Sequence, residues 1–559
     1  MRTSNLRKLW LLVLLTPFAQ ASEVVVSGAN VEYRGVQNDT AGTNSFYGIR
    51  YAKAPVSDLR WRAPVPIKSC DQRGSIDARQ RGPMCLQSSP AWAASIYANT
   101  SGTQDEDCLL LDIVTPISAA CDKLPVMVQI HGGGYVGGSS SSFPGASIVN
   151  QAKGTLIYVA IQYRLGPLGF LAGDEIAANG SWNVGLLDQR AALDWVQQNI
   201  HFFGGDPEKV TITGGSAGGG SVSLQMTMYG GSAPAPFRAA IPEYPWWTPM
   251  LDQAQLNKQY ETFVQAANCT SSECLRKAPL SIIQLATNKS LETAYNQGDY
   301  AYGTFYWGPT VDGHIIQEGP LQAFSQGHFQ QVPVLIDRDG NEGFSFSNVS
   351  ITTTDEVLSD LERLWPNETF LVDALELYPN STYNASMIEA LNVIQALEAA
   401  LGGNMSFSSA FVQRDALFGN ALVNCPTEYM ALAASRAGVP TYKMIFDAGL
   451  QLHGATGPYL FSDYINPSGE FTYGPITVPG NDTLAVMMRD YFISFAVALD
   501  PNKAVSSSAG RPQWSPYNAS NNETAVLLIQ DAGIKIVKDL DVNARCNYLE
   551  SSAAYMMEI

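Results

Sequence analysis

The serine at position 216 has the surroundings of a chemically reactive side chain. It lies in the glycine-rich stretch "TITGGSAGGGSV", between the β-forming run "KVTIT" and residues that can begin a helix. Gly214 and Gly218 stand two positions before and after Ser216, where a sharp strand-to-helix turn has room only for small residues. A phosphate-binding loop would require a Gly-Lys-Ser/Thr sequence, which does not follow. The pattern predicts a nucleophilic serine held on a strained turn.

A serine nucleophile requires a base, together with an acid that orients the base. The chain contains five histidines: His131, His201, His314, His328 and His453. In folds that use such a turn, the acid and then the histidine follow the serine along the chain. After the apolar run Val332 to Ile336, the available acids are Asp337, Asp339 and Glu342. If the acid comes from this strand end, His453 is the only histidine that remains.

A third motif could stabilise negative charge during a reaction. The stretch "HGGGYVGG" begins at His131, directly after the apolar run Val126 to Ile130. Consecutive glycines let backbone N–H groups approach a substrate oxygen without obstruction by side chains. We expect Gly133 and Gly134 to be donors to an oxyanion, joined by Ala217, the residue after the serine.

Six short apolar runs rich in Val and Ile have the composition of buried parallel strands. They are Leu124 to Gly132, Thr155 to Gly166, Lys209 to Gly215, Phe237 to Glu243, Val332 to Asp339 and Pro440 to Ala448. Between them lie helical patterns such as Gly185 to Ile200. Strands alternating with helices predict an α/β fold with a large, mostly parallel sheet flanked by helices. Because no repeat or long linker divides the chain, a single catalytic domain over residues 22–559 is favoured over two fused domains.

Residues 1–21 have the organisation of a secretory signal peptide. A basic start is followed by a short apolar run and by Ala19-Gln20-Ala21, a small-x-small cleavage pattern. Eight cysteines and many Asn-x-Ser/Thr sequons agree with a secreted, glycosylated chain. The sequons include Asn38, Asn99, Asn179, Asn348, Asn380 and Asn481. No later run is apolar enough to anchor the chain in a membrane.

The charge and composition exclude several classes of partner. The net charge is −18 and no basic block occurs, which argues against nucleic acids and anionic membranes. No His/Cys cluster has the spacing of a metal site, so neither a metal nor an organic cofactor is expected. The sequence leaves the oligomeric state open.

Taken together, these segments resemble the type-B carboxylesterase/lipase family, which includes cholinesterases and secreted fungal lipases. The resemblance runs from about Val36 to Glu550 and includes "EDCLLLDIVTP", "NVGLLDQRAALDWVQQNIHFFGGDPEKVTITGGSAGG" and "VPVLIDRDGNEGFSF". It implies the α/β-hydrolase fold. By position, Glu342 in "NEG" matches the acid of the family and "LHGATGPYLF" its histidine segment, so the implied triad is Ser216, Glu342 and His453.

The resemblance also implies disulfides. Cys85 and Cys108 match a pair that closes a loop over the active site, Cys269 and Cys274 match a short second pair, and Cys425 and Cys546 match a third. Cys70 and Cys121 remain and would pair by exclusion.

The function implied is that of a secreted serine carboxylesterase acting on small-molecule esters. One alternative is a triacylglycerol or sterol-ester lipase of the same family. The loop between Cys85 and Cys108 is short and mostly small or polar, and Trp92 and Tyr97 are its only aromatic residues. A lipase lid needs an apolar face, so soluble esters are favoured, and Trp92 is expected to anchor the loop. The alternative from another class is a non-catalytic, cholinesterase-like adhesion protein, which would lack the catalytic serine.

Two departures from the family pattern lie near Ser216. Gly215 stands where relatives commonly carry Glu, and Tyr244 stands where many carry Ser. We hypothesise that the Tyr244 ring fills the space at Gly215 and that its hydroxyl bonds near Glu342 or His453. Independent drift is the other interpretation, with Tyr244 in the core or lining the acyl pocket beside Trp246 and Trp247. Without the carboxylate, cationic choline-type esters should not be preferred.

Overall fold

The fold is described from a computed structural model. It covers residues 22–67, 73–93, 102–119, 123–383, 407–461, 470–473, 476–503, 510–521 and 523–552. The expected signal peptide, residues 1–21, lies outside these ranges, as do Tyr97, Asn99, Cys70 and Cys121.

A 13-stranded sheet forms the centre of the molecule, with strand order β1-β2-β3-β5-β7-β6-β8-β9-β10-β11-β14-β15 and β4 paired with β2. Its strands are β1 (Ser22–Ser27), β2 (Val31–Asn38), β3 (Thr43–Arg50), β4 (Gly74–Asp77), β5 (Leu110–Pro116), β6 (Leu124–Ile130), β7 (Ile157–Ile161), β8 (Gly205–Gly215), β9 (Ala239–Glu243), β10 (Val334–Asp339), β11 (Thr441–Asp447), β14 (Ala525–Gln530) and β15 (Gly533–Lys538). A separate hairpin consists of β12 (Glu470–Tyr473) and β13 (Ile476–Pro479).

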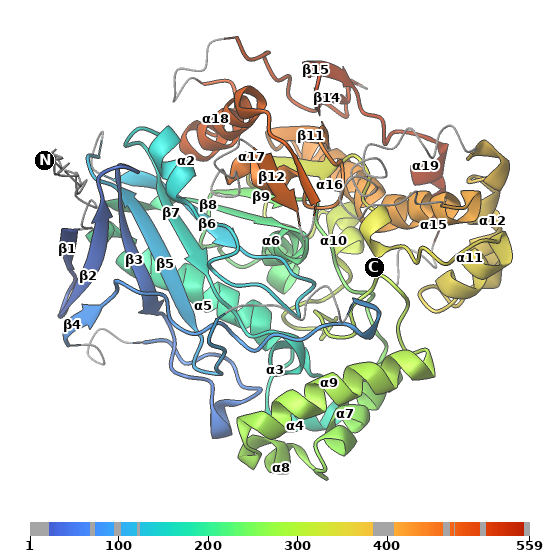
Figure 1. Cartoon of the computed structure of the whole chain (residues 1–559), viewed down its shortest axis with the longest axis horizontal. Coiled ribbons are helices and arrows are strands. Elements are labelled where there is room, and N and C mark those ends of the chain that lie inside the picture. The colour runs from blue at the N-terminus through green and yellow to red at the C-terminus, as the bar shows by residue number, and fades with distance from the viewer. Residues whose placement is uncertain are drawn as a thin grey trace, which may run out of the picture.

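The six strands expected from the sequence are confirmed, and they are neighbours. They form the parallel centre of the sheet in the order β7-β6-β8-β9-β10-β11. On one side the blue strands β1, β2, β3 and β5 flank this centre with antiparallel pairing (Figure 1). On the other side β14 pairs in parallel with β11, and β15 is antiparallel to β14. These flanking strands were not anticipated. Exposure explains this for β1 and β15, which are largely exposed, but not for β5 and β14, which are buried.

Helices cover both faces of the sheet. They are α2 (Ala146–Gln151), α3 (Gly166–Phe170), α4 (Asp174–Asn179), α5 (Val184–Asn199), α6 (Ala217–Thr227), α7 (Gln253–Ala266), α8 (Ser272–Lys277), α9 (Leu280–Gln297), α10 (Pro320–Gln326), α11 (Thr354–Leu361), α12 (Glu368–Glu376), α15 (Ser409–Gly419), α16 (Cys425–Arg436), α17 (Thr456–Leu460), α18 (Asp482–Ala498) and α19 (Ala544–Ser551). The green helices α7, α8 and α9 gather below the sheet in Figure 1, and α11, α12 and α15 lie to its right.

The alternation of side chains along the strands creates two separate cores. On β6, Val126 and Val128 belong to the larger core, which includes α5, α6 and α16, whereas Met127 belongs to a second core that includes α2, α17 and α18. We call these the α16 face and the α18 face of the sheet. Because every central strand is covered on both faces, its sequence reads as a continuous apolar run.

Candidate active site

Ser216 occupies the sharp turn between β8 and α6. Its backbone has φ 59° and ψ −127°, a sparsely populated region that costs a residue with a side chain about 1–3 kcal/mol. The turn is held by neighbouring backbone, because Ser216 N donates to Glu243 O (3.1 Å) and Trp246 N donates to Ser216 O (3.1 Å). A strained Ser216 backbone that is held by two hydrogen bonds agrees with the predicted nucleophile turn.

The two glycines that flank Ser216 are required by close backbone contacts. A Cβ atom on Gly214 would lie 2.6 Å from Ile130 O, and one on Gly218 would lie 2.2 Å from the same oxygen. Both distances are far below ordinary van der Waals contact. The glycines at these positions therefore let β8 and α6 pass close to the end of β6.

His453 and Glu342 face each other at the end of the sheet. His453 Nδ1 lies 2.5 Å from Glu342 Oε2, and Glu342 Oε1 accepts from Asp339 N (2.5 Å). Both side chains are buried. The loops that carry them are joined, since Asn341 N donates to Gln451 O (2.6 Å). A carboxylate bonded to one ring nitrogen fixes the imidazole tautomer and leaves Nε2 as the basic nitrogen.

The three predicted triad residues follow strands that end at the same edge of the sheet. Strand β9 lies between β8 and β10, with Glu243 in register with Gly215 on one side and Asp337 on the other. Strand β11, which leads to His453, is the next neighbour of β10. Parallel strands end at a common edge, so Ser216 and the loops of Glu342 and His453 meet there.

The glycine loop after β6 lies against Ser216. A Cβ atom on Gly132 would be 3.1 Å from Ser216 Cβ and 2.5 Å from Gly215 O. Gly133 and Gly134 have φ values of 106° and 62°, which side chains on L-residues rarely adopt. Glycine is thus needed for the shape of the loop as well as for access. Ala217, the third expected donor, is the first residue of α6, where backbone N–H groups point out of the helix.

The contacts of His131 are those of a buried residue that supports the fold. Its Nδ1 lies 2.9 Å from Gly132 O, and its ring stacks on Tyr163 at a centroid distance of 4.4 Å. Burial lowers the pKa of His131 to about 4, so the ring is neutral near pH 7. The other three histidines outside the predicted triad contact other side chains, as His201 packs against Phe202, His314 against Tyr229, and His328 pairs with Glu318.

The Tyr244 ring lies against Gly215. A Cβ atom on Gly215 would be 2.1 Å from the Tyr244 hydroxyl oxygen, so the ring occupies the space that a side chain there would need. The ring also meets the His453 imidazole edge to face, at a centroid distance of 5.1 Å. Tyr244 is therefore a direct neighbour of both the nucleophile turn and the base.

The two tryptophans after Tyr244 differ in their surroundings. Trp246 packs against Phe305 at 5.0 Å, and Phe305 in turn occupies the space beside Gly134. Trp247 is buried in the core, where its indole N–H donates to Gly220 O (3.1 Å). Of the two, Trp246 is the one that approaches the glycine loop.

An aromatic cluster connects the loop after Cys85 to the base. Trp92 packs against Tyr302, Phe305 and Phe346 at 5.1–6.2 Å, and its indole N–H donates to Thr304 O (2.6 Å). Phe346 also meets His453 at 5.0 Å. Trp92 is anchored, as expected. Phe305 and Phe346 were not predicted as site residues, because no local motif marks a ring that the fold brings to a site from elsewhere in the chain.

Buried carboxyl groups lie at the edge of the sheet where the predicted triad meets. Glu243 and Asp337 are register neighbours and are almost fully buried. Burial raises the pKa of Glu243 to about 7, and burial together with the charge of Glu243 raises that of Asp337 well above its usual range. Burial and the charge of Glu342 act in the same direction on the pKa of Asp339. Asp337 and Asp339 were considered as catalytic acids, but Glu342 is the acid that contacts His453.

Three disulfides are present: Cys85–Cys108, Cys269–Cys274 and Cys425–Cys546. These are three of the four pairs that the sequence implied, and the fourth lies outside the described residues. Among the residues that the structure describes, no group of three or more His, Cys, Asp or Glu side chains could hold a metal ion. Within the same ranges, no helix combines the length and apolarity needed to cross a membrane.

Comparisons with known proteins agree on one family. The model of the carboxylesterase family matches residues 18–548. Lipase 2 of Geotrichum candidum is 31% identical over 87% of this chain and 89% of its own length, and carboxylesterase patB of Aspergillus clavatus is 28% identical over 96% and 98%. A further relative, from Gibberella zeae, is named a secreted triacylglycerol lipase. The crystal structure of Aspergillus niger EstA superposes with a TM-score of 0.78 at 25% identity, covering 96% of this chain and 99% of that one.

Proposed function

Given that the chain belongs to the carboxylesterase family and is an ester-hydrolysing enzyme with the α/β-hydrolase fold, we propose that Ser216, His453 and Glu342 are its catalytic triad. The observation that supports this most is the bond between His453 Nδ1 and Glu342 Oε2. It joins two side chains 111 residues apart at the edge of the sheet where the strained Ser216 turn also ends.

In this mechanism His453 accepts the proton of Ser216 as the serine oxygen attacks the ester carbonyl. Glu342 holds the imidazole in place and stabilises its charged form. Backbone N–H groups of Gly133, Gly134 and Ala217 bind the oxyanion of the tetrahedral intermediate. The alcohol leaves with the proton from His453, and water then hydrolyses the acyl-enzyme by the same steps in reverse.

The test is hydrolysis of a soluble chromogenic ester by purified variants. Ser216→Ala should lose essentially all turnover, and Glu342→Gln should lose about 10³–10⁴-fold in kcat because the histidine loses its orienting carboxylate. Ser232→Ala, a change at an exposed serine, is the matched control and should behave as the wild type. Turnover by Ser216→Ala close to that of the control would disprove the mechanism.

The substrates proposed are small, soluble esters, and the chain is proposed to act outside the cell after removal of residues 1–21. Support for soluble substrates comes from Trp92, which is fixed at its ring and its indole N–H at the start of the loop that a lipase would use as a lid. A triacylglycerol lipase is the second candidate, favoured by the names of several relatives. The rate should rise smoothly through the solubility limit of the ester, whereas a sharp increase when an emulsion forms would favour the lipase.

A further inference from the structure

Asp339 contacts the loops of both proposed triad partners. Its backbone N–H donates to Glu342 Oε1 (2.5 Å). Its carboxylate accepts from Gly454 N (2.6 Å), from Thr456 N (3.0 Å) and from Thr456 Oγ1 (2.7 Å). Gly454 directly follows His453 in the chain. One fully buried residue at the end of β10 is therefore bonded to the acid itself and to the loop of the base.

We propose that Asp339 is a positioning residue that fixes the spacing between Glu342 and His453, an inference that rests on the proposed triad. Besides the bond between His453 and Glu342, the loop after β11 is tied to the acid loop at its start, where Asn341 N donates to Gln451 O. Asp339 adds three bonds on the other side of His453. Its side chain thus fixes Gly454 and Thr456, the first and third residues after the histidine, and the imidazole is held between two anchored points.

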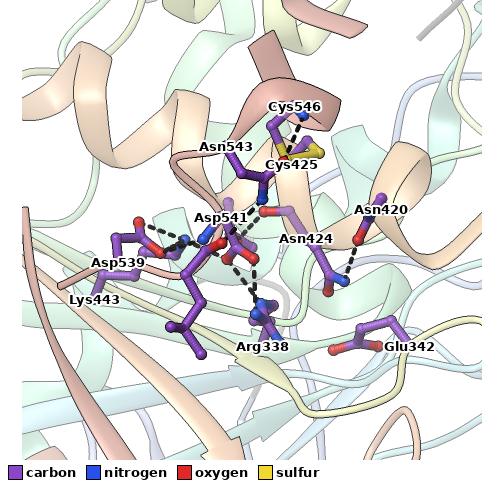
Figure 2. A network of polar contacts seen from close by, with 12 residues as sticks. Arg338, Glu342, Asn420, Asn424, Cys425, Lys443, Asp539, Asp541, Asn543 and Cys546 are labelled. Atoms are coloured by element: carbon purple, nitrogen blue, oxygen red, sulfur yellow. Dashed lines mark hydrogen bonds and ion pairs between the residues drawn. A yellow bond between two sulfur atoms is a disulfide. The ribbon is translucent and has the colours of Figure 1, made fainter. Parts of the chain in front are cut away.

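Asp339 is itself held from the opposite face of the sheet. Arg338 Nη1 donates to Asp339 O (2.9 Å), while Arg338 Nε and Nη2 donate to the carboxylate of Asp541 (2.8 and 2.7 Å). Figure 2 shows that Asp541 also meets Lys443, at 2.7 Å from its Nζ. Lys443 lies on β11, the strand that leads to His453. The C-terminal segment therefore ties together the two strands from which the acid and base loops depart.

Misplacement of reacting groups by about 1 Å can lower a rate about 10²-fold without weakening the binding of substrate. Asp339→Ala removes both carboxylate oxygens and with them three hydrogen bonds, so we expect kcat for a soluble ester to fall about 30- to 100-fold while KM changes less than about threefold. Asp339→Asn keeps one acceptor oxygen and should recover part of the rate. Thr456→Val removes only the Oγ1 bond and should lower kcat about three- to tenfold.

Asp312 supplies the matched control. Its Oδ1 accepts from three backbone N–H groups, of His314, Ile315 and Ile316, in a turn elsewhere in the molecule. Asp312→Ala should lower the thermal midpoint but leave kcat of the folded enzyme within about twofold of the wild type. A merely structural role of Asp339 would give the same result as this control.

The outcomes separate the two proposals when Ser216→Ala is measured in the same series. If Ser216→Ala keeps its turnover, the triad is wrong. If Ser216→Ala is inactive but Asp339→Ala has the kcat of the wild type, only the positioning role is overturned. If Asp339→Ala does not fold, Asp339→Asn and Thr456→Val decide the question: a lowered kcat at unchanged KM supports the role, and an unchanged kcat in both overturns it.

Discussion

The two faces of the sheet bury charged groups in opposite ways near the same strand end. On the α18 face, Glu243 and Asp337 lie side by side, and Thr213 and the backbone of Tyr244 supply neutral donors to them. On the α16 face, Arg338 and Lys443 meet Asp539 and Asp541 in a connected set of ion pairs (Figure 2). Asp337 and Arg338 are consecutive residues, so the pleat of β10 alone sends them into these different surroundings.

The difference shows two solutions to the cost of removing a charge from water. Burial raises the pKa of Glu243 to about 7, which favours its neutral form. Burial alone would also raise the pKa of Asp541, but Arg338 and Lys443 lower it to about 2. Glu428, another carboxyl group on the α16 face, resembles Glu243 in this respect. Despite the nearby Lys443, burial raises its pKa to about 8, which favours its neutral form. Stability from a paired carboxylate is lost as the pH falls, whereas stability from a carboxyl group that is protonated in the fold is lost as the pH rises. The pH dependence of the unfolding free energy therefore distinguishes the two solutions.

The largest expected effect comes from breaking the paired side. Lys443→Met should lower the free energy of unfolding by about 3–5 kcal/mol, because it leaves Asp539 and Asp541 buried with too little positive charge. Denaturant unfolding near pH 7 measures this loss. Lys277→Met removes a lysine from the exposed pair with Glu273 and should show no measurable change. Equal stability of the two variants would contradict the importance of pairing.

The next effect tests the unpaired side through pH. The pKa of Glu243 is raised from 4.5 to about 7 in the folded protein, so its folded state binds a proton that the unfolded state releases. Stability from this group is present below about pH 4.5 and is lost as the pH rises to about 7, a change of roughly 3 kcal/mol. Glu243→Gln stays neutral at every pH. In this window its unfolding free energy should fall with pH less steeply than that of the wild type, by the amount that corresponds to about one proton. An unchanged slope would show that Glu243 is ionised in the fold.

A smaller effect of opposite sign is expected in acid. Because the pKa of Asp541 is lowered from 3.8 to about 2, its contribution to stability is present above about pH 4. It is lost as the pH falls towards 2, and it amounts to about 2 kcal/mol. Asp541→Asn should remove this acid-dependent loss, although the variant is less stable at every pH because a pair is broken. Unfolding followed between pH 2 and pH 5 would contradict the prediction if both proteins lose stability equally.

The smallest effect concerns one hydrogen bond at the edge of the paired set. The Tyr517 hydroxyl donates to Asp539 Oδ2 (3.0 Å), and both groups are buried. Tyr517→Phe should cost about 1–2 kcal/mol, since it removes a neutral donor to a carboxylate that Lys443 still pairs. A loss as large as that of Lys443→Met would mean that the Tyr517 hydroxyl stabilises this set of buried charges as strongly as the lysine does.

Local sequence patterns were sufficient to predict the six central strands of the sheet. The six apolar runs became six neighbouring parallel strands, because burial on both faces demands continuous apolar residues. Among the flanking strands that were missed, β1 and β15 are mostly exposed, whereas β5 and β14 are buried and exposure does not explain the miss. At the site, Glu342 was assigned by resemblance alone, because chain order and residue type left Asp337 and Asp339 equally possible.

The sequence by itself predicted the chemistry that we propose for the site. A serine between two obligatory glycines, a glycine loop after a strand and a single histidine in the right order are all local features, and each is visible without coordinates. Only the tertiary structure decided which contacts each of the three acids at this strand end makes. Glu342 bonds the imidazole, Asp339 bonds the loop beyond it, and Asp337 lies beside Glu243. The physical reason is that a carboxyl group takes its role from the donors and charges around it, and those come from strands and loops far away in the chain.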